Sequence, residues 1–482
     1  MIKQATINSS TFSISGQCRC DAKYGIFVSQ DSWNAFQYNG QLQALSDLLI
    51  PLPISKVSKG ELNDDYYLIN ISDQTPGEGI INENNVAVAD VLNSDKTILS
   101  DCDILVSKLG MTRGYIYLKP ESKMPLIGSS EFIPYKLRDN TNGLFYLYLL
   151  LMPQMRNAYR CLETGKTPSH KRVNPTEFLK ICVPVIKKDL IETANEKIKA
   201  IIAEIITLNS QKVDTQIIVD EVFSRHFSLD SELRNKLHKG MTFGTQSSMN
   251  THFSTFTSSL SQLSKTGAIR LSARSVTPIF SELEEIVKKN GYYTINEIVS
   301  EEIHRGKSPT YVPDGEIPVV KTAHLKNGEV LITEEEFVTK AFFDSKPLAQ
   351  VAKGDILIAS TGKPSIGKVD LMNHDIDMFA DGHVTILRIS EDRCLKQFLV
   401  YYLWSVLGCY QIEKEYAGST NQIEIYPDQI GNIIIPDIPI STQEQIIREI
   451  QDKINNQSDI STKVSQLRNE INKIISDVIN AE

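Results

Sequence analysis

The chain has 482 residues, of which 41% are hydrophobic and 23% are charged, and its formal net charge is −9. A chain of this length exceeds one hydrophobic core, so two to four domains are expected. No apolar stretch is long enough for a membrane-spanning helix, and MIKQATINSS at the start lacks the apolar core of a signal peptide. These features predict a cytoplasmic protein. Seven cysteines without a Cys-x-x-Cys pair predict free thiols.

The negative net charge argues against a protein whose whole surface attracts nucleic acid, because such binding depends on neutralising phosphates. A local basic patch is nevertheless sufficient for binding, so the negative net charge of the whole chain does not exclude binding of nucleic acid.

Residues 1–185 predict an α+β domain. After an Arg-x-x-Ala opening at Arg19 come short β-rich runs separated by turn residues, and an apolar run at 144–152 predicts a buried helix. The sequence Gly-Lys-Thr at 165–167 resembles the end of a phosphate-binding loop. Arg160 stands where such a loop requires a glycine, so an ATP site is not expected.

Residues 186–228 predict a helical spacer, because apolar residues follow one another at steps of three and four. This stripe consists of Ile191, Ala194, Ile198, Ile201, Ile205 and Leu208. Residues 229–262 are rich in Ser and Thr, which predicts a connection between domains.

Residues 263–437 predict a second α+β domain, which opens with Arg-x-x-Ala at Arg270. A helix over 280–291 is followed by short strands, including IPVV from 317 and GEVLI from 328, then a buried helix, a glycine loop and a last strand that ends at Pro436. Residues 438–482 predict a second helical spacer. Its stripe contains Ile450, Ile460, Val464, Leu467, Ile471 and Ile474. We expect the two stripes to pack against each other; packing of each helix on its own domain is the alternative.

The two halves repeat each other at a constant spacing. Asp103 and Asp355 are 252 positions apart, as are Pro184 and Pro436, and intervening motifs keep this offset within a residue or so. The period far exceeds that of a solenoid repeat, so it indicates a domain duplicated in tandem. The counterpart of the Gly-Lys-Thr loop is AGST at 417–420, which has no lysine and again excludes an ATP site.

Motifs of catalysis are absent from the sequence. It has no Gly-x-Ser-x-Gly, no His-Glu-x-x-His and no Gly-x-Gly-x-x-Gly after a strand, and its eight histidines lack ligand spacing. We therefore expect no catalytic residue and no metal site. A duplicated binding module explains the pattern more simply than an enzyme.

Basic and small polar residues recur in equivalent loops of the two copies. Such side chains contact DNA phosphates and base edges; ordinary solvated loops are the alternative. The candidates in the first copy are Lys108, Arg113, Lys166, His170, Lys171 and Arg172. Those in the second copy are Lys321, His324, Lys326, Thr361, Lys363, Ser365, Lys368, Ser419, Thr420, Asn421 and Gln422. The loops differ while the framework is kept, as expected of modules that recognise different targets.

The layout resembles the specificity subunit of type I restriction-modification systems over nearly the full chain. The resemblance is carried by the Arg-x-x-Ala openings and by IPVVKTAHLKNGEV, GDILIASTGKPSIGKV and GSTNQIEIYPDQIGNIIIPDIPISTQEQIIREI of the second copy. The first copy is looser: LINISDQTPGEGI replaces the strand-and-turn stretch, and TGKTPSHKR is more basic than its counterpart.

This resemblance implies two target-recognition domains, each followed by a long helix, with the two helices packed antiparallel as a spacer between the halves of a split site in double-stranded DNA. The subunit would have no catalytic activity and would bind no cofactor directly. The implied partners are two methyltransferase subunits that use S-adenosylmethionine and endonuclease-translocase subunits that use ATP.

Two other interpretations stay open at this point. The chain could serve an orphan methyltransferase or another defence complex as its recognition subunit. It could also be a protein scaffold without a DNA role, or a DNA mimic, which a net charge of −9 permits.

Overall fold

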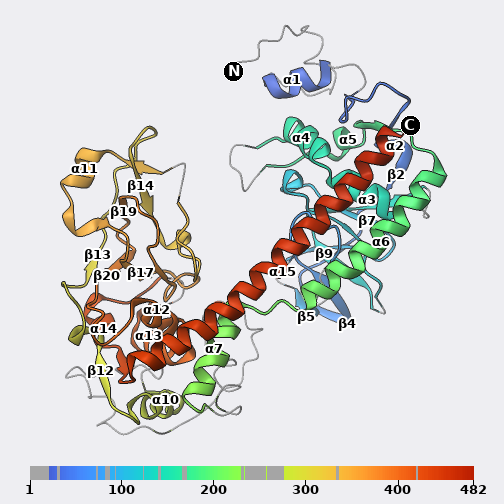
Figure 1. The fold of residues 1–482 in the computed structure, drawn as a ribbon. Coiled ribbons are helices and arrows are strands. Elements are labelled where there is room, and N and C mark those ends of the chain that lie inside the picture. Colours follow the sequence, from blue (N-terminus) through green and yellow to red (C-terminus); the bar gives the residue numbers. More distant parts are fainter. Residues whose placement is uncertain are drawn as a thin grey trace. The chain divides into compact units, whose positions relative to one another are not determined.

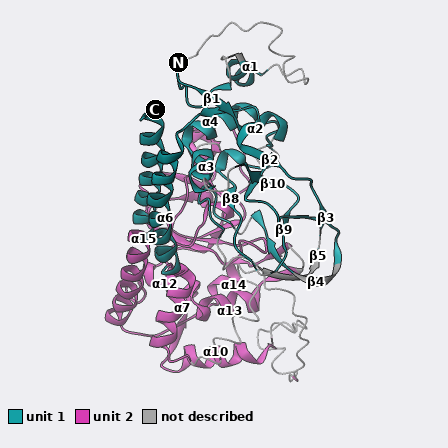
Figure 2. Ribbon diagram, turned by 90° about the vertical axis from the view of Figure 1, so that its right-hand side faces the viewer, with its two compact units in different colours: residues 1–211, 460–482 teal, residues 212–459 magenta. Residues whose placement is uncertain are grey.

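The computed structural model describes residues 21–29, 33–71, 74–81, 87–92, 94–122, 124–138, 143–165, 171–229, 233, 257, 276–332, 336–419 and 422–481. They form two compact units, unit 1 with residues 1–211 and 460–482, and unit 2 with residues 212–459 (Figure 2). Both units contain helices and strands, so the predicted α+β class is confirmed. The openings at Arg19 and Arg270 and nearly all of the predicted connection at 229–262 lie outside the described residues.

Unit 1 is built from short strands and helices and receives the end of helix α15 (Figure 1). Its elements are α1 (Ala22–Ser29), β1 (Leu42–Ala44), α2 (Leu45–Leu48), β2 (Leu49–Pro51), β3 (Lys56–Val57), β4 (Gly60–Ile69), β5 (Ala87–Leu92), β6 (Lys96–Ile98), β7 (Ile104–Ser107), η5 (Met111–Arg113), β8 (Ile116–Leu118), β9 (Leu126–Ser129), β10 (Phe132–Leu137), α3 (Gly143–Leu151), α4 (Pro153–Leu162), α5 (Pro175–Phe178), β11 (Cys182–Pro184) and α6 (Lys188–Ser210).

An antiparallel sheet with the strand order β2-β10-β7-β8 separates two apolar cores in unit 1. Successive side chains of a strand point to opposite faces. Ile104 and Val106 of β7 therefore join the core that contains helix α3, whereas Leu105 joins a smaller core on the other face. A second sheet, β3-β6-β9-β4-β5, adjoins this one, and its strands β4 and β9 are parallel.

Unit 2 has the corresponding elements and the beginning of α15 (Ile440–Asn480). They are α7 (Thr215–His226), α10 (Pro278–Lys288), β12 (Tyr292–Thr294), η9 (Ile295–Glu297), β13 (His304–Arg305), β14 (Ile317–Val320), η10 (Thr322–His324), β15 (Phe337–Val338), α11 (Lys340–Asp344), η11 (Pro347–Ala349), β16 (Gln350–Val351), β17 (Ile356–Ala359), β18 (Val369–Leu371), β19 (Met378–Ala380), β20 (Val384–Leu387), α12 (Lys396–Trp404), α13 (Val406–Glu415), β21 (Ala417–Ser419), β22 (Gln422–Glu424), α14 (Pro427–Gly431) and β23 (Ile434–Pro436).

The topology of unit 1 recurs in unit 2, which confirms the predicted duplication. The sheet β13-β20-β17-β18 has the order and the antiparallel pairing of β2-β10-β7-β8, and β14 lies parallel to β19 as β4 lies parallel to β9. Helices α12, α13 and α14 follow as α3, α4 and α5 do, and each last strand pairs with the first strand of its unit. The alternation is also repeated, because Ile356 and Ile358 face one core and Leu357 and Ala359 face the other.

One predicted strand is absent. The sequence GEVLI at 328–332 forms only the isolated bridge Leu325↔Val330 within the described residues. The backbone N–H groups of Lys326, Asn327 and Gly328 are bonded to the carboxylate of Asp370 instead of to a neighbouring strand. The carboxylate therefore holds a turn at Lys326–Gly328, where the predicted strand was to begin.

The helical spacers differ in continuity. Helix α15 is one unbroken helix of 41 residues, about 60 Å long at 1.5 Å per residue. The region predicted at 186–228 is instead two helices, α6 and α7, separated by residues 211–214. Asp214 caps α7 by accepting a hydrogen bond from Gln216 N, which explains why a new helix begins there. No helix of the described residues is both long and apolar enough to cross a membrane.

The apolar stripes of the spacers are largely buried. In unit 1, the core shared by α6 and the end of α15 contains Ile191, Ala194, Ile198, Ile201, Ile205, Val464, Leu467, Ile471, Ile475 and Ile479, with Leu208, Ile460 and Ile474 partly buried at its margin. Ile450 lies in the core of unit 2 together with residues of α7. The buried residue that follows Ile471 in α15 is Ile475 and not the predicted Ile474, which is only partly buried. The reason is that a straight helix repeats every 3.6 residues and not every 3.5.

Ion pairs connect these helices within each unit. In unit 2, Lys453 pairs with Glu221 at 3.2 Å and Glu449 with Arg225 at 2.5 Å, so α7 and α15 are antiparallel. In unit 1, Lys463 pairs with Glu204 near the end of α6 at 2.8 Å, and Figure 1 shows α6 beside the last part of α15.

Candidate nucleic-acid interface

In unit 2, the loop after strand β17 pairs with the hairpin β21–β22. Thr361 forms a bridge with Glu424, Gly362 N donates to Ile423 O at 3.0 Å, and Ile425 N donates to Ser360 O at 2.9 Å. Gly362 has a φ of +83°, which a residue with a side chain adopts only with strain. Two of the loops predicted from the sequence therefore form a single surface, which we call the loop–hairpin junction of unit 2 (residues 359–362 with 417–419 and 422–425).

Unit 1 contains the same junction, formed by residues 107–110 with 164–165 and 171–173. Leu109 forms a bridge with Arg172, and Val173 N donates to Lys108 O at 3.1 Å. Both bridges fall at equivalent positions, since 109 + 252 = 361 and 172 + 252 = 424. Gly110, like its counterpart, has a positive φ, of +63°. The duplication thus extends to the hydrogen bonds that hold the candidate surface together.

A third group of candidates in unit 2 is attached to strand β18 through Asp370. Its carboxylate is fully buried and accepts backbone hydrogen bonds from Lys326 at 2.7 Å, Asn327 at 3.1 Å and Gly328. Burial raises the pKa of Asp370 to about 6, although these bonds favour the charged form. Burial, together with the charge of Lys326, lowers the pKa of Lys368.

Several candidates are engaged by neighbouring carboxylates and rings. Lys321 donates to Glu336 at 2.6 Å and lies 4.6 Å from the centre of the Tyr311 ring. His324 Nδ1 accepts a hydrogen bond from Lys321 N at 3.2 Å, and burial lowers the pKa of its imidazole. These two side chains therefore hold the segment after β14 in place as well as offering polar groups.

The remaining candidates divide by exposure. Lys363, Lys171 and Gln422 are exposed, and within the described part of the chain neither lysine has an ion pair. Ser365 N closes a turn on Gly362 O at 2.9 Å. Arg113 lies over the Tyr115 ring at 5.0 Å, and Ser419 ends β21. Lys166, His170, Thr420 and Asn421 lie outside the described residues.

Four charged or aromatic residues of the junctions were not predicted from the sequence, namely Glu131, Arg305, Glu424 and Tyr426. Arg172 makes a two-point contact with Glu131, with Nε and the terminal nitrogen at 3.1 and 2.8 Å. In unit 2, Arg305 donates to Glu424 and lies 5.1 Å from the centre of the Tyr426 ring. The offset of 252 was a usable signal for Glu424, the counterpart of Arg172. Nothing local in the sequence indicated Glu131 or Arg305.

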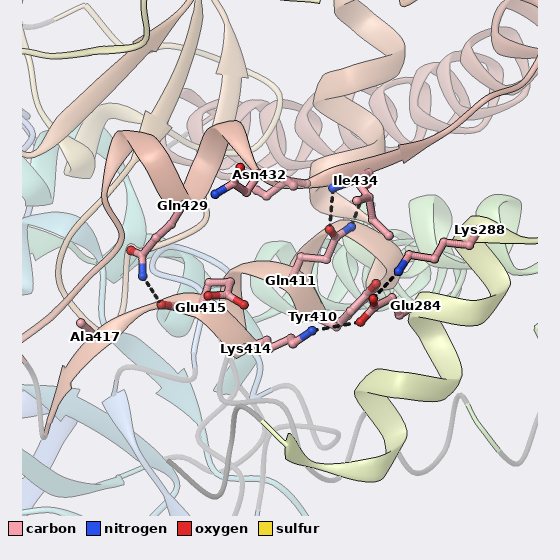
Figure 3. A pocket seen from close by; sticks show the side chains of 11 residues that line it. Glu284, Lys288, Tyr410, Gln411, Lys414, Glu415, Ala417, Gln429, Asn432 and Ile434 are labelled. Carbon is pink, nitrogen blue, oxygen red and sulfur yellow. Dashed lines mark hydrogen bonds and ion pairs between the residues drawn. The ribbon is translucent and has the colours of Figure 1, made fainter. Parts of the chain in front are cut away.

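A cavity of about 710 Å³ in unit 2 lies beside the base of the hairpin, between α10, α13 and α14 (Figure 3). Lys288 and Lys414 point at Glu284 from two helices, at 2.5 and 3.0 Å. Against the effect of burial, their hydrogen bonds lower the pKa of Glu284 to about 2. Gln411 bonds to the backbone of Ile434 through both its amide nitrogen and its oxygen. These contacts connect the helices that carry the hairpin.

Among the described residues, no group of three His, Cys, Asp or Glu side chains could hold a metal.

Residues 288–473 match the family model of the type I restriction modification DNA specificity domain. No curated protein matches the chain. Solved structures to which the chain is similar include a chain from a study of the assembly and conformational transition of the type I R-M system, with 14% identity and a TM-score of 0.39 over 91% of this chain and 97% of that one. The S subunit of the type I restriction-modification system of M. genitalium has 13% identity and a TM-score of 0.38 over 91% and 96%. The HsdS subunit from Thermoanaerobacter tengcongensis has 14% identity and a TM-score of 0.29 over 91% and 96%.

The matched segment runs from the end of α10 into α15 and includes the whole loop–hairpin junction of unit 2. Residues 288–473 are therefore similar to the DNA specificity domain of type I restriction modification, and the junction of unit 2 lies within the similar part.

Proposed function

We propose that the chain is the DNA-recognition subunit of a type I restriction-modification complex, and that each unit recognises one half of a bipartite site. The observation that carries this proposal is the repeated junction. The family model matches only the second repeat, yet unit 1 builds the same bridge between the same positions on the same sheet. Unit 1 is then a second specificity domain whose sequence has diverged.

The exposed cations of the junctions suit a role at DNA. Lys171 and Lys363 are exposed beside backbone that is fixed by the junction hydrogen bonds. A lysine in such a place contacts phosphates and positions the domain, while neighbouring polar side chains contact base edges. Since the whole chain carries a charge of −9, partner subunits supply much of the remaining positive surface.

Helices α6, α7 and α15 act as the spacer and as the docking surface for partners in this proposal. Helix α15 is continuous and contributes to both units, and two modules joined in one chain raise each other's effective concentration at DNA. Ile206 of α6 and Ile217 of α7 are 52% and 46% exposed, which offers apolar contacts to other proteins. The partners are two methyltransferase subunits that hold S-adenosylmethionine and endonuclease-translocase subunits that hold ATP, and this chain holds neither.

Single-molecule methylation mapping tests the proposal. Host DNA is mapped with the chain and its methyltransferase present, and again with this chain deleted. We expect a split N6-methyladenine motif that disappears on deletion. An unchanged methylome would reject the proposal and favour a protein scaffold without a DNA role.

A charge reversal identifies the surface. Lys363→Glu in the loop after β17 should abolish methylation at the motif, because it places a negative charge against phosphates. Lys353→Glu is the matched control, since Lys353 is also exposed but lies before β17, at the opposite end of the same strand. Equal loss of methylation in both variants would show that the junction is not the DNA surface.

The spacer role has its own test. Inserting four residues at Lys212, in the exposed segment between α6 and α7, should change the number of base pairs between the half-sites and leave both half-sites unchanged. An altered half-site with an unaltered gap would contradict the spacer role.

A further inference from the structure

The two junctions carry opposite charges at the same backbone position. The framework around that position is identical in the two units: Lys108 N donates to Glu131 O at 3.0 Å, and Ser360 N donates to His383 O at 2.9 Å. These pairs are again 252 positions apart. Within this frame, position 172 is Arg and its counterpart, position 424, is Glu.

In unit 1 the Arg172 side chain is oriented by Glu131. The two-point contact fixes the plane of the guanidinium, and Lys108 adds a second cation at 4.0 Å from the same carboxylate. The hydrogen bond from Arg172 lowers the pKa of Glu131, so the acid is ionised. The Arg172 side chain nevertheless stays 41% exposed, so it is held in position and accessible.

In unit 2 the Glu424 side chain is oriented by a different set of groups. Arg305 of β13 donates to one carboxylate oxygen, and the hydroxyl of Tyr426 donates to the other at 2.8 Å. Arg305 is itself fixed by Ile425 O at 2.6 Å and by the Tyr426 ring. Glu424 is 34% exposed. Strand β2, which takes the place of β13 in unit 1, is Leu-Ile-Pro and provides no such cation.

The stability of the fold does not require opposite charges at positions 172 and 424. Partly exposed ion pairs contribute about 0–1 kcal/mol, and residues that serve the framework are alike in both repeats, as Gly110 and Gly362 are. At 172 and 424 the sign of the charge has changed, and the orienting partner comes from a different element: Glu131 lies in the turn between β9 and β10, whereas Arg305 lies in β13. A side chain that is exposed, immobilised by neighbours and variable between repeats has the properties of a specificity determinant.

We propose that Arg172 and Glu424 are equivalent base-recognising positions, that Arg172 contacts guanine, and that Glu424 contacts cytosine. Arg donates to O6 and N7 of guanine in the major groove, whereas a carboxylate accepts from the N4 amino group of cytosine. This inference rests on the proposed function and adds to it a base preference at one position of each half-site.

Charge-swapped double variants test it, because they keep an ion pair at each junction. Glu424→Arg with Arg305→Glu should change one base of the second half-site from cytosine to guanine and leave the first half-site as it was. Arg172→Glu with Glu131→Arg should change one base of the first half-site from guanine to cytosine and leave the second half-site as it was. Each full-length variant is co-expressed with the same methyltransferase, and its methylated motif is mapped. Discrimination against the formerly preferred base should reach about tenfold or more.

A single substitution covers the case in which a double variant does not fold. Glu424→Gln keeps the size of the side chain and one carbonyl oxygen for Arg305, and it should reduce the preference for cytosine at that one position. Circular dichroism of the purified chain establishes folding. A folded variant whose two half-sites match the wild type overturns the inference while the proposed function stands. A wild-type chain that specifies no split motif defeats the proposed function and this inference together.

Discussion

The two units attach an equivalent segment to their sheets by different chemistry. Tyr117 of β8 and Asp370 of β18 pair with Leu105 and Leu357, which are 252 positions apart. The Tyr117 hydroxyl donates one hydrogen bond to Thr75 O at 3.1 Å. Asp370 accepts from three successive N–H groups instead. A buried carboxylate organises more backbone than a phenol, but the burial of its charge is unfavourable, as the raised pKa of Asp370 shows.

The units also differ in how their cores are completed. The core of unit 2 is formed by one continuous part of the chain, residues 212–459, whereas unit 1 needs residues 460–482 from the far end. Five side chains of this last stretch are buried in the core of unit 1, namely Val464, Leu467, Ile471, Ile475 and Ile479. The difference predicts unequal sensitivity of the units to changes at the C-terminus.

The largest expected effect is that of removing this last stretch. Ending the chain after Asp459 should destabilise unit 1 by about 8–15 kcal/mol as an upper estimate, at about 1.5–3 kcal/mol for each buried apolar side chain. Hydrogen exchange should become fast in β7 and β10 and stay slow in β17 and β20. Removing only Ala481 and Glu482 is the control and should change neither. Equal loss of protection in both units would contradict the separate cores.

The next effect concerns the anchor of unit 2. Asp370→Ala removes the acceptor of the Asn327 and Gly328 N–H groups, while Lys326 N keeps Glu329 O as a second acceptor at 3.2 Å. We expect a loss of about 3–5 kcal/mol in the free energy of unfolding of unit 2. Urea denaturation followed by tryptophan fluorescence measures it, since Trp404 donates to Val369 O at 2.6 Å beside the anchor. A change below about 1 kcal/mol would show that water replaces the carboxylate.

The pH dependence of the same group gives an effect of about 3 kcal/mol. The pKa of Asp370 rises from its ordinary 3.8 to about 6 in the folded protein, so the folded state binds the proton more tightly than the unfolded chain. Its contribution to stability is therefore fully present below pH 3.8 and is lost as the pH rises through about 6. Unfolding of wild type and Asp370→Asn is compared between pH 4 and 7. Parallel curves for the two proteins would contradict the shift.

The smallest effect is expected at the equivalent position of unit 1. Tyr117→Phe removes one neutral hydrogen bond and keeps the ring in its core, so unit 1 should lose about 1 kcal/mol. Thermal unfolding of the full chain measures the change. A loss as large as that of Asp370→Ala would mean that the two anchors are energetically alike, and the contrast between the units would disappear.

The duplication made much of the fold and part of the candidate site predictable from the sequence. The constant offset related the loops after β7 and β17 and the segments around positions 172 and 424, and the structure brings both pairs together. The break at 211–214 had a local signal in Asp214, a good helix N-cap, which the continuing apolar stripe obscured.

The charge partners were not predictable, because they depend on strand register between distant residues. Arg172 meets Glu131 across 41 positions, and Arg305 meets Glu424 across 119. Either basic residue, taken alone, has the appearance of a phosphate contact. The role of Asp370 was hidden for the same reason, since its hydrogen-bond donors lie 42 to 44 positions earlier.

The division of α15 between the units also orders events during synthesis on the ribosome. The first 211 residues of unit 1 emerge early, but the helix that covers α6 emerges last, about 250 residues later. At about 5–20 residues per second, the apolar face of α6 waits roughly 12–50 s for its cover, while unit 2 has all of its residues first. A prematurely terminated chain lacks Val464, Ile471 and Ile475 and leaves the part of the unit 1 core that they complete uncovered, so chaperones and proteases can distinguish it from a finished molecule.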